Sequence, residues 1–486
     1  MSQKLSEYER ERQKNIERNK ELLKQLKVPS VGSKHGLPAA KKPEPAAKKS
    51  GAQHKVKPVK KEKVAPSRAS ARLRGIAADA NNEEGLKRTA EEFRELQEAK
   101  KPKRVAKLEG QEHQDFLKIL EDTKMDGKIT VKIPNDGPPS DKVPKSLQEE
   151  ASNLDIRHIW PTVKVTPERI NFAAFHPSST KILACAGDMS GSLGFWDVNA
   201  EKEDPDEEHP QPVVYTYRPH TRSVTCMMYN PGNASQLYTS SYDGTIQYFD
   251  MEKATFVNAL EDKDSGLPFT NFDMTHDGQN IWFSTSDGTV GHYDRRSPKS
   301  KHSTYDLREK KVGCISLNLA DQNYLACASN DRSATIWDVR HMKKNPKPLL
   351  EFEHGYAVSA CYWSPNGKKL LTTSYDNRLR IMGTDKQIKD MELEHSIEHN
   401  NRTGKWVTLF RAKWNYNPSA FSHSHFCVAS MNHPVEIYSG ETGERICELY
   451  DPEKVTAVPA VCLFHPTSPK MMVLSGNGSG RMACWS

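Results

Sequence analysis

Residues 328–340 read ASNDRSATIWDVR, a polar turn and a short strand-like segment closed by Trp337 and Asp338. Degraded copies of this arrangement run in phase through the C-terminal two thirds of the chain. The closing aromatic residue or its substitute stands at Trp196, Phe249, Tyr293, Trp337, Met382, Tyr438 and Trp485. The spacings are therefore 53, 44, 44, 45, 56 and 47 residues. A repeat length in the mid-forties that ends in such an aromatic and aspartate pair is typical of β-propeller blades. Seven copies predict seven blades.

A second marker keeps the same phase, because an apolar strand ends in a bulky residue with proline two positions later. The pairs are Phe175 with Pro177, Tyr229 with Pro231, Trp363 with Pro365, and Phe464 with Pro466. By repeat logic Trp485 closes the third strand of the last blade, whose outer strand is then missing. We expect residues 158–165, just before the first inner strand, to supply it, since ring closure removes exposed sheet edges.

The charge divides the chain into two parts. A seven-bladed propeller accounts for roughly 320 residues as one domain, so we expect an N-terminal extension over 1–150 and a propeller over 151–486. The extension has 35 Lys+Arg against 24 Asp+Glu, whereas the remainder has 35 against 39. A basic extension on a near-neutral body favours attraction to a polyanion, most often nucleic acid. The alternative is a solvated extension that binds nothing.

The extension itself is expected to be largely disordered and partly helical. Residues 3–27 favour a helix that forms on a partner. Residues 31–74 hold 13 Lys+Arg among Pro and Ala, a composition that predicts disorder. A second helical run over 83–99 precedes Lys100–Arg104 (KKPKR), which resembles a nuclear import signal, the alternative being one more charged linker.

Nothing in the sequence indicates an enzyme, a metal or a cofactor. The nine cysteines are scattered without a CxxC pair or zinc spacing, and the common phosphate-binding, esterase and metalloprotease motifs are absent. His220, Asp243 and neighbouring serines could suggest a hydrolase. In WD repeats, however, such a pair is commonly structural, and His354 with Asp376 repeats the relation. No apolar run reaches the roughly 20 residues of a membrane span, and no signal sequence is evident, which predicts a soluble intracellular protein.

The connections between blades carry the candidate binding residues, because in a propeller they all open on one face. Besides Arg169, Lys310, Lys311, Arg402 and Lys405, this face should include Arg218, Arg222, Lys454, Arg332 and Arg378. Such a distribution favours a phosphate-tracking surface, the alternative being scattered solvated charges. The longest connection, 396–408, carries Trp406 between cations. That ring could stack on bases or anchor the loop to its own blade.

These features resemble the WD-repeat DNA damage-binding protein family, through the repeats, the ATIWDVR close and the HNNRTGKWVTLFRAKW stretch that begins at His399. The resemblance implies that a hairpin from this insertion enters the minor groove at a lesion. It implies that Arg402, Lys405 and Trp406 lie on the part of this hairpin that enters the groove. It also implies that Arg169 and Lys310 or Lys311 bind the DNA backbone. The expected ligand is duplex, and also single-stranded, DNA, with a preference for UV-irradiated duplex. Chromatin proteins are expected as further partners.

The same family uses a WDxR close to engage the propeller adaptor of a cullin ubiquitin ligase. Trp337, Asp338 and Arg340 match this pattern, and Asp294 with Arg296 form a looser copy after Tyr293. The resemblance therefore implies an adaptor site at Asp338, Arg340 and Arg296, opposite the basic loops. The leading hypothesis is a nuclear, non-enzymatic DNA-binding propeller that acts in the damage response, with possible cytoplasmic residence. The rival hypothesis is an interaction scaffold or ubiquitin-ligase substrate receptor whose partner is a protein.

Overall fold

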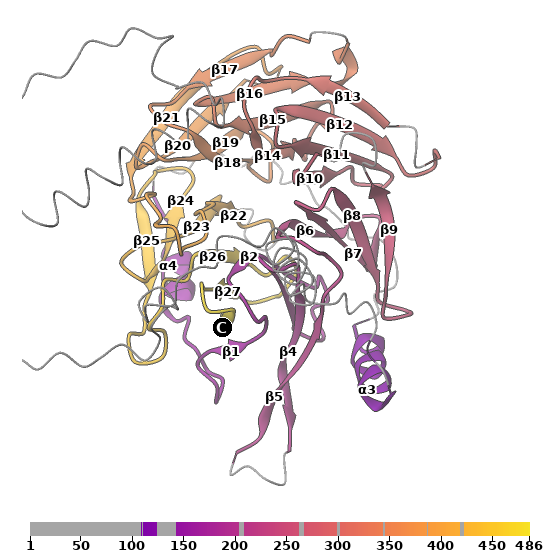
Figure 1. Cartoon of the computed structure of the whole chain (residues 1–486). Helices are drawn as coiled ribbons and strands as arrows, with labels where there is room; N and C mark the ends of the chain where they lie inside the picture. Colours follow the sequence, from indigo (N-terminus) through magenta and orange to yellow (C-terminus); the bar gives the residue numbers. More distant parts are fainter. Residues whose placement is uncertain are drawn as a thin grey trace, which may run out of the picture. The chain divides into compact units, whose positions relative to one another are not determined.

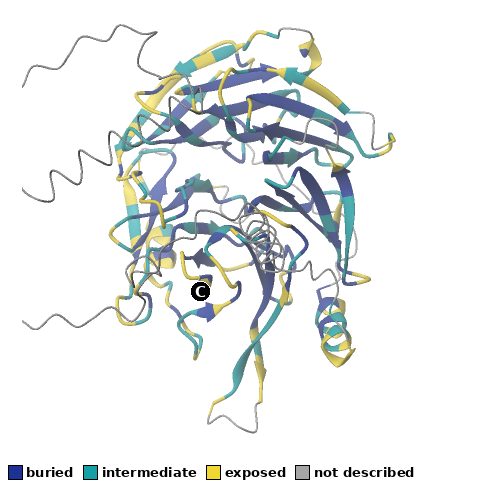
Figure 2. Cartoon of the chain, viewed as in Figure 1, coloured by how far each residue is buried: buried dark blue, intermediate teal, exposed yellow. Residues whose placement is uncertain are grey.

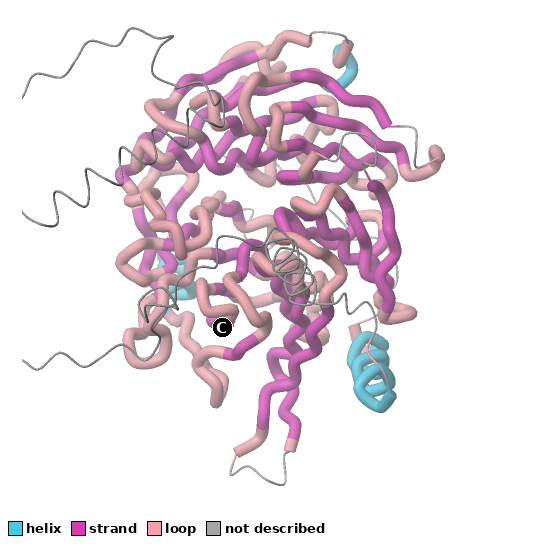
Figure 3. The backbone as a smooth tube through the Cα atoms, viewed as in Figure 1, coloured by secondary structure: helices cyan, strands magenta, loops and turns pink. Residues whose placement is uncertain are grey.

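The computed structural model describes residues 108, 110–123, 142–203, 209–261, 267–298, 302–343, 346–385, 387–417 and 422–486. The segments 3–27, 31–74 and 83–99 and the candidate import signal, for which helix or disorder was predicted, lie outside these residues. Strands are the main secondary structure of the described residues, and two α-helices precede them (Figure 3).

The strands form seven four-stranded antiparallel sheets (Figure 1). The first four, from inner to outer strand, are β2 (Ile170–Phe175), β3 (Leu183–Asp188), β4 (Leu193–Lys202), β5 (Gln211–Tyr217); β6 (Val224–Asn230), β7 (Asn233–Ser241), β8 (Thr245–Asp250), β9 (Thr255–Glu261); β10 (Phe269–Met274), β11 (Asn280–Thr285), β12 (Thr289–Asp294), β13 (His302–Asp306); and β14 (Val312–Leu317), β15 (Tyr324–Ser329), β16 (Ser333–Asp338), β17 (Leu350–Glu353).

The last three sheets follow the same order. They are β18 (Val358–Trp363), β19 (Lys369–Ser374), β20 (Arg378–Thr384), β21 (Met391–Glu398); β22 (Lys413–Trp414), β23 (His425–Ala429), β24 (Val435–Ser439), β25 (Arg445–Leu449); and β26 (Val461–Phe464), β27 (Val473–Gly476), β28 (Arg481–Trp485), β1 (Val163–Lys164). Each inner strand contacts the inner strands of both neighbouring sheets, and β26 contacts β2, so the ring is closed. The prediction of a seven-bladed propeller is confirmed.

The ring closes where the sequence predicted. Val163 pairs with Met482 and Lys164 with Arg481, so a strand from before the first blade completes the last one. The donor strand is shorter than the expected 158–165. Asp155 and Ser486 also exchange two backbone hydrogen bonds, of 3.0 and 3.4 Å. Both edges that an open array would leave unpaired are thus covered.

The core lies between the blades. Both faces of each sheet pack on neighbouring sheets, which is why β15 reads YLACAS without polar alternation. The closing Trp337 pairs across the sheet with Leu325, and both are buried. Figure 2 shows buried residues running through the inner strands, while exposed residues gather in outer strands and loops.

The turn between the second and third strands has a fixed backbone shape in successive blades. Its last position has positive φ, 76° at Gly244, 101° at Gly288, 79° at Arg332 and 60° at Asn377. Glycine adopts this conformation freely, whereas arginine is strained there. In blade 4 the preceding Asp331 accepts hydrogen bonds from the amide and hydroxyl of Ser333, which helps to hold the turn.

Two helices outside the repeats pack on the ring. In α3 (Gly110–Glu121) Phe116 is fully buried and stacks on Tyr215 with ring centroids 4.4 Å apart. In α4 (Lys145–Ser152) Glu150 accepts a hydrogen bond of 2.8 Å from the Met471 amide. The predicted boundary at residue 150 stays a prediction, but parts of 1–150 are integrated into the propeller.

Candidate nucleic-acid interface

A basic cavity of about 650 Å³ opens on the ring face where the connections between blades meet. Its cations come from four blades, since Arg169 precedes β2, Arg222 precedes β6, Lys311 precedes β14, and Lys405 and Arg411 precede β22. No aspartate or glutamate is among the described residues that line it. Cations that are far apart in the sequence therefore converge on one opening without local compensation.

The chain itself orients these cations. Arg169 Nη1 donates a hydrogen bond of 2.6 Å to the Lys405 carbonyl, and Arg222 Nη1 donates one of 2.9 Å to the Tyr242 carbonyl. Lys311 Nζ donates to the Tyr242 hydroxyl. Within the described part of the chain none of these three side chains makes an ion pair. Neutral partners fix the side chains but leave their charge available to a ligand, which strengthens the positive field of the cavity.

The insertion after β21 is a loop tied down at both ends. Asn401 is buried and donates 2.9 Å to the Ser374 carbonyl, while the Thr408 hydroxyl donates 2.5 Å to the Ile170 carbonyl. Between them, Val407 N donates 3.1 Å to the Gly404 carbonyl in a turn. No strand lies between 399 and 412, all of which are described, so the probe position is a turn rather than a strand-paired hairpin.

Trp406 stands at the tip of this loop with 78% of its surface exposed. Lys405 Nζ lies 5.2 Å from its ring centroid. The ring is therefore not an anchor buried in its own blade. Trp414, by contrast, is buried and donates a hydrogen bond of 2.9 Å to the Tyr362 carbonyl, so this ring belongs to the core.

Two further aromatic rings on this face sit beside cations. The Arg402 guanidinium lies 5.7 Å from the centroid of Tyr356, a residue 56% exposed. Lys311 Nζ lies 5.0 Å from the centroid of Tyr242. A cation over a ring binds a phosphate while the ring offers a stacking face, so these pairs suit an unstacked nucleic-acid strand.

Not every expected cation contributes. Lys310 is exposed but does not line the cavity. Lys454 pairs with Asp155 and Asp451 at 3.0 and 3.1 Å, and Arg378 pairs with Glu398 at 3.2 Å. Their charges are compensated within the chain, because carboxylates from neighbouring segments reach the same face.

Sequence reasoning missed Arg411. The expected insertion ended at residue 408, whereas Arg411 lies beyond it, two residues before Lys413 at the start of β22. Residues at i and i+2 of an extended chain point to the same side. The spacing of Arg411 and Lys413 therefore indicated that these two side chains share one side of the chain.

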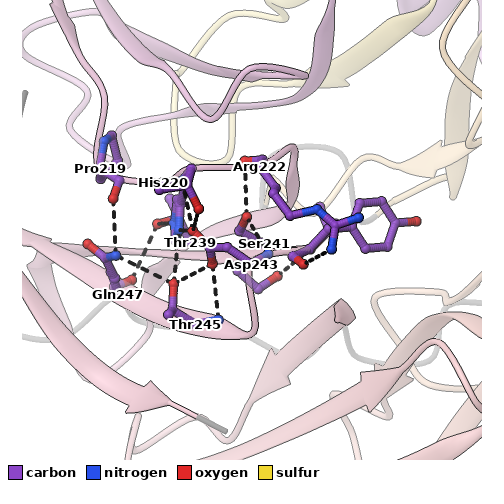
Figure 4. A network of polar contacts seen from close by, with 12 residues as sticks. Pro219, His220, Arg222, Thr239, Ser241, Asp243, Thr245 and Gln247 are labelled. Carbon is purple, nitrogen blue, oxygen red and sulfur yellow. Dashed lines mark hydrogen bonds and ion pairs between the residues drawn. The ribbon is translucent and has the colours of Figure 1, made fainter. Parts of the chain in front are cut away.

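The candidate triad is structural (Figure 4). His220 is fully buried, and its Nδ1 lies 3.2 Å from Asp243 Oδ2 while its Nε2 lies 2.9 Å from the Thr239 hydroxyl. The Ser241 hydroxyl donates to the Arg222 carbonyl instead of approaching the imidazole. The network thus joins strands within one blade, and the serine that could have been a nucleophile is engaged elsewhere.

His354 does not repeat that arrangement. Its Nε2 lies 3.0 Å from the Thr372 hydroxyl, but Asp376 pairs with Arg380 at 2.7 Å and accepts 3.1 Å from the Gly355 amide. The sequence relation of histidine and aspartate therefore does not produce a direct bond here, because Arg380 is a stronger partner for the carboxylate.

The WDxR residues lie at the other end of the third strands. Arg340 forms a two-pronged pair with Asp338, with Nε to Oδ1 at 2.9 Å and Nη2 to Oδ2 at 2.7 Å, yet its side chain stays 52% exposed. Arg296 makes the same pair with Asp294 in the adjacent blade. Hydrogen bonds from Arg340 hold the pKa of the Asp338 carboxyl well below its usual range. Two arginines are thus presented in fixed orientations on the face opposite the basic cavity.

The described residues contain no group of His, Cys, Asp and Glu that could hold a metal ion. Across those same residues, every helix is too short or too polar to span a bilayer.

The fold and this face define a WD-repeat propeller with a basic opening. The WD domain, G-beta repeat model matches residues 211–250, 300–338 and 346–381. The chain is 34% identical to DNA damage-binding protein cmr1 of Aspergillus oryzae, covering 100% of this chain and 99% of that protein. It is 31% identical to the Phaeosphaeria nodorum protein and 32% to the Neurospora crassa protein of this name, each covering 99% of this chain and 98% of the relative. The chain belongs to the family of DNA damage-binding protein cmr1.

Proposed function

We propose that this protein binds DNA in the nucleus, with a preference for damaged duplex such as UV-irradiated DNA, and that it acts in the damage response without catalysing a reaction. The observation that carries this proposal is the basic cavity, whose described lining residues include no carboxylate, beside an exposed Trp406. Relatives covering the whole chain are named for binding damaged DNA, which supports the same function.

The residues have different tasks in this proposal. Arg169, Arg222, Lys311 and Lys405 neutralise phosphates, and Arg402 does so beside Tyr356. Such contacts carry no sequence or lesion information. Trp406 supplies the preference, because a damaged base costs less to unstack than a paired one and exposes a face for stacking.

The test is Trp406→Ala, titrated against intact and irradiated duplex of one sequence. Base stacking contributes roughly 1–3 kcal/mol, so affinity for irradiated DNA should fall more than affinity for intact DNA, with the melting temperature unchanged. Lys405→Ala should weaken both about equally. Leu349→Ala is the matched control, since it removes an exposed apolar side chain just before β17. Equal decreases on both duplexes for Trp406→Ala would contradict the proposal.

A second candidate function concerns the opposite face. We infer that Arg340 and Arg296 dock the propeller adaptor of a cullin ubiquitin ligase, supported by their matching, aspartate-held geometry on adjacent blades. Strand β16 lies between Arg340 and the cavity residue Asn330 and is roughly 17 Å long, at about 3.3 Å per residue. DNA and adaptor could therefore be bound at once.

This inference predicts that Arg340→Ala reduces co-purification with the adaptor several-fold and leaves DNA affinity unchanged. Arg332→Ala is a control on the other end of the same strand, because its exposed side chain lies in the turn before β16. If Arg340→Ala weakened DNA binding as much as adaptor capture, the separation of the two faces would be refuted.

A further inference from the structure

A second cavity, of about 290 Å³, lies among the inner strands beneath the basic opening. Its walls are largely apolar and include Phe172, Trp414 and Phe464 from three blades. Asn171, Leu409 and Arg411 line both this inner cavity and the basic cavity, so the two adjoin. The proposed DNA-binding function assigns no role to the inner cavity.

Lys413 brings an uncompensated cation to this inner cavity. Its Nζ lies 3.6 Å from the ring centroid of Tyr362 and 5.0 Å from that of Phe172. Among the described residues its ammonium group makes no hydrogen bond and no ion pair. Burial lowers the pKa of this group, as expected when a charge is desolvated without a partner.

The nearby carboxylate of Asp273 does not pair with Lys413. Its Oδ2 accepts 2.7 Å from the Leu317 amide and its Oδ1 accepts 2.8 Å from the Met274 amide. Burial raises the pKa of this carboxyl to about 6. Asp273 therefore accepts hydrogen bonds from backbone amides of its own surroundings, and among the described residues it makes no ion pair with Lys413.

Arg411 is a second cation with unused hydrogen-bonding capacity. Its Nη1 donates a long hydrogen bond of 3.3 Å to the Asn171 carbonyl, and its Nε is buried without a partner. The guanidinium lies 5.3 Å from the Phe172 centroid. Arg411 and Lys413 thus contact the same aromatic ring from the same segment of chain.

A buried polar group without a partner is unfavourable, and a buried charge more so. Contacts with aromatic rings offset only part of this cost. An anion placed between Arg411 and Lys413 would pair both cations through charge-assisted hydrogen bonds. The apolar walls would at the same time favour a ligand with a hydrocarbon body.

We propose that the inner cavity binds a small organic monoanion, with its carboxylate between Arg411 and Lys413 and its apolar body against Phe172, Trp414 and Phe464. A cavity of about 150 Å³ accommodates benzene, so this one has room for a ligand of roughly ten non-hydrogen atoms. A medium-chain or aromatic monocarboxylate has that size and charge.

The experiment uses the full chain and compares octanoate with octan-1-ol, which has the same chain length and no charge. Calorimetric titration should show octanoate binding tighter by about tenfold or more, since a charge-assisted hydrogen bond exceeds a neutral one. Lys413→Met keeps an unbranched apolar side chain, one atom shorter, but removes the charge, and it should abolish this preference. Lys311→Met, a control in the basic cavity, should reduce DNA affinity and retain octanoate binding. Inorganic phosphate alone should not compete, because it lacks the apolar body.

Amine-selective labelling of the unaltered protein, read by mass spectrometry, is independent of whether Lys413→Met folds. Octanoate should protect Lys413 from the reagent and octan-1-ol should not. Equal affinity for the two ligands, unchanged octanoate binding in Lys413→Met, or absence of protection would each overturn the inner-cavity proposal. The DNA titrations would be unaffected by that failure, so the two proposals are separable.

Discussion

Two buried histidines each hold a turn after an inner strand. His176 Nδ1 accepts 3.1 Å from the Ser178 amide, and His465 Nδ1 accepts 2.9 Å from the Ser468 amide. A ring nitrogen can accept only while it carries no proton. Burial lowers the pKa of each imidazole to about 4. The bulky-residue and proline pattern located both turns, but a single sequence does not say which nitrogen of a histidine accepts.

These histidines predict a decrease in stability on mild acidification. Because the unfolded pKa is about 6.5, the unfolded state binds more protons between pH 6.5 and 4, and the free energy of unfolding falls as pH falls through that window. The stabilisation is fully present above pH 6.5. For each residue the decrease should be on the order of 1–2 kcal/mol between pH 7 and pH 5. Thermal unfolding at a series of pH values measures this. His465→Asn, whose side-chain oxygen can still accept, should show a shallower pH dependence.

At the scale of elements, the repeat period predicted the seven sheets and the donor strand, because period and closing residue repeat in every blade. Helices α3 and α4 were missed, since they are single elements inside a charged and polar region. Phe116 and Leu120, spaced i and i+4, were the available signal for a helix with one buried face.

The candidate site was predicted only in part. Whether a cation stays unpaired depends on carboxylates from segments that are distant in the sequence, as the pair of Lys454 and Asp155 shows.

Helix α3 predicts a local rather than global effect of mutation. Phe116→Ala removes the side chain that packs on Tyr215, Phe195 and Phe249, and a buried Phe→Ala change costs about 3–5 kcal/mol where the structure cannot relax. Here the helix can leave the ring, so the destabilisation is limited to its docking free energy. Hydrogen exchange should rise across 110–121 and in β5, with little change in blades 4 to 6. Gln114→Ala, on the exposed side, is the control. Uniform destabilisation of all blades would contradict this division.

At the scale of the whole molecule, the charge is divided more sharply than a boundary at residue 150 indicates. Residues 1–107 carry 29 Lys+Arg against 14 Asp+Glu, a balance of +15, whereas residues 108–486 carry 41 against 49, a balance of −8. We therefore expect the attraction to DNA over distance to come from residues 1–107. The propeller contributes a local concentration of cations in one cavity despite its negative total.

Two truncations separate these contributions. Removal of 1–107 keeps α3, α4 and β1, so the melting temperature should be unchanged. Affinity for intact duplex should nevertheless fall. The slope of log affinity against log salt concentration should become shallower by about 0.9 for each phosphate that the shortened protein no longer neutralises.

Removal of 1–152 also deletes Phe116 and the hydrogen bond between Glu150 and Met471, and should lower the melting temperature by several degrees. The excess affinity for irradiated duplex should survive the first truncation, because Trp406 remains on its anchored loop. A steep salt dependence that persists without 1–107 would instead assign the long-range attraction to the cavity itself.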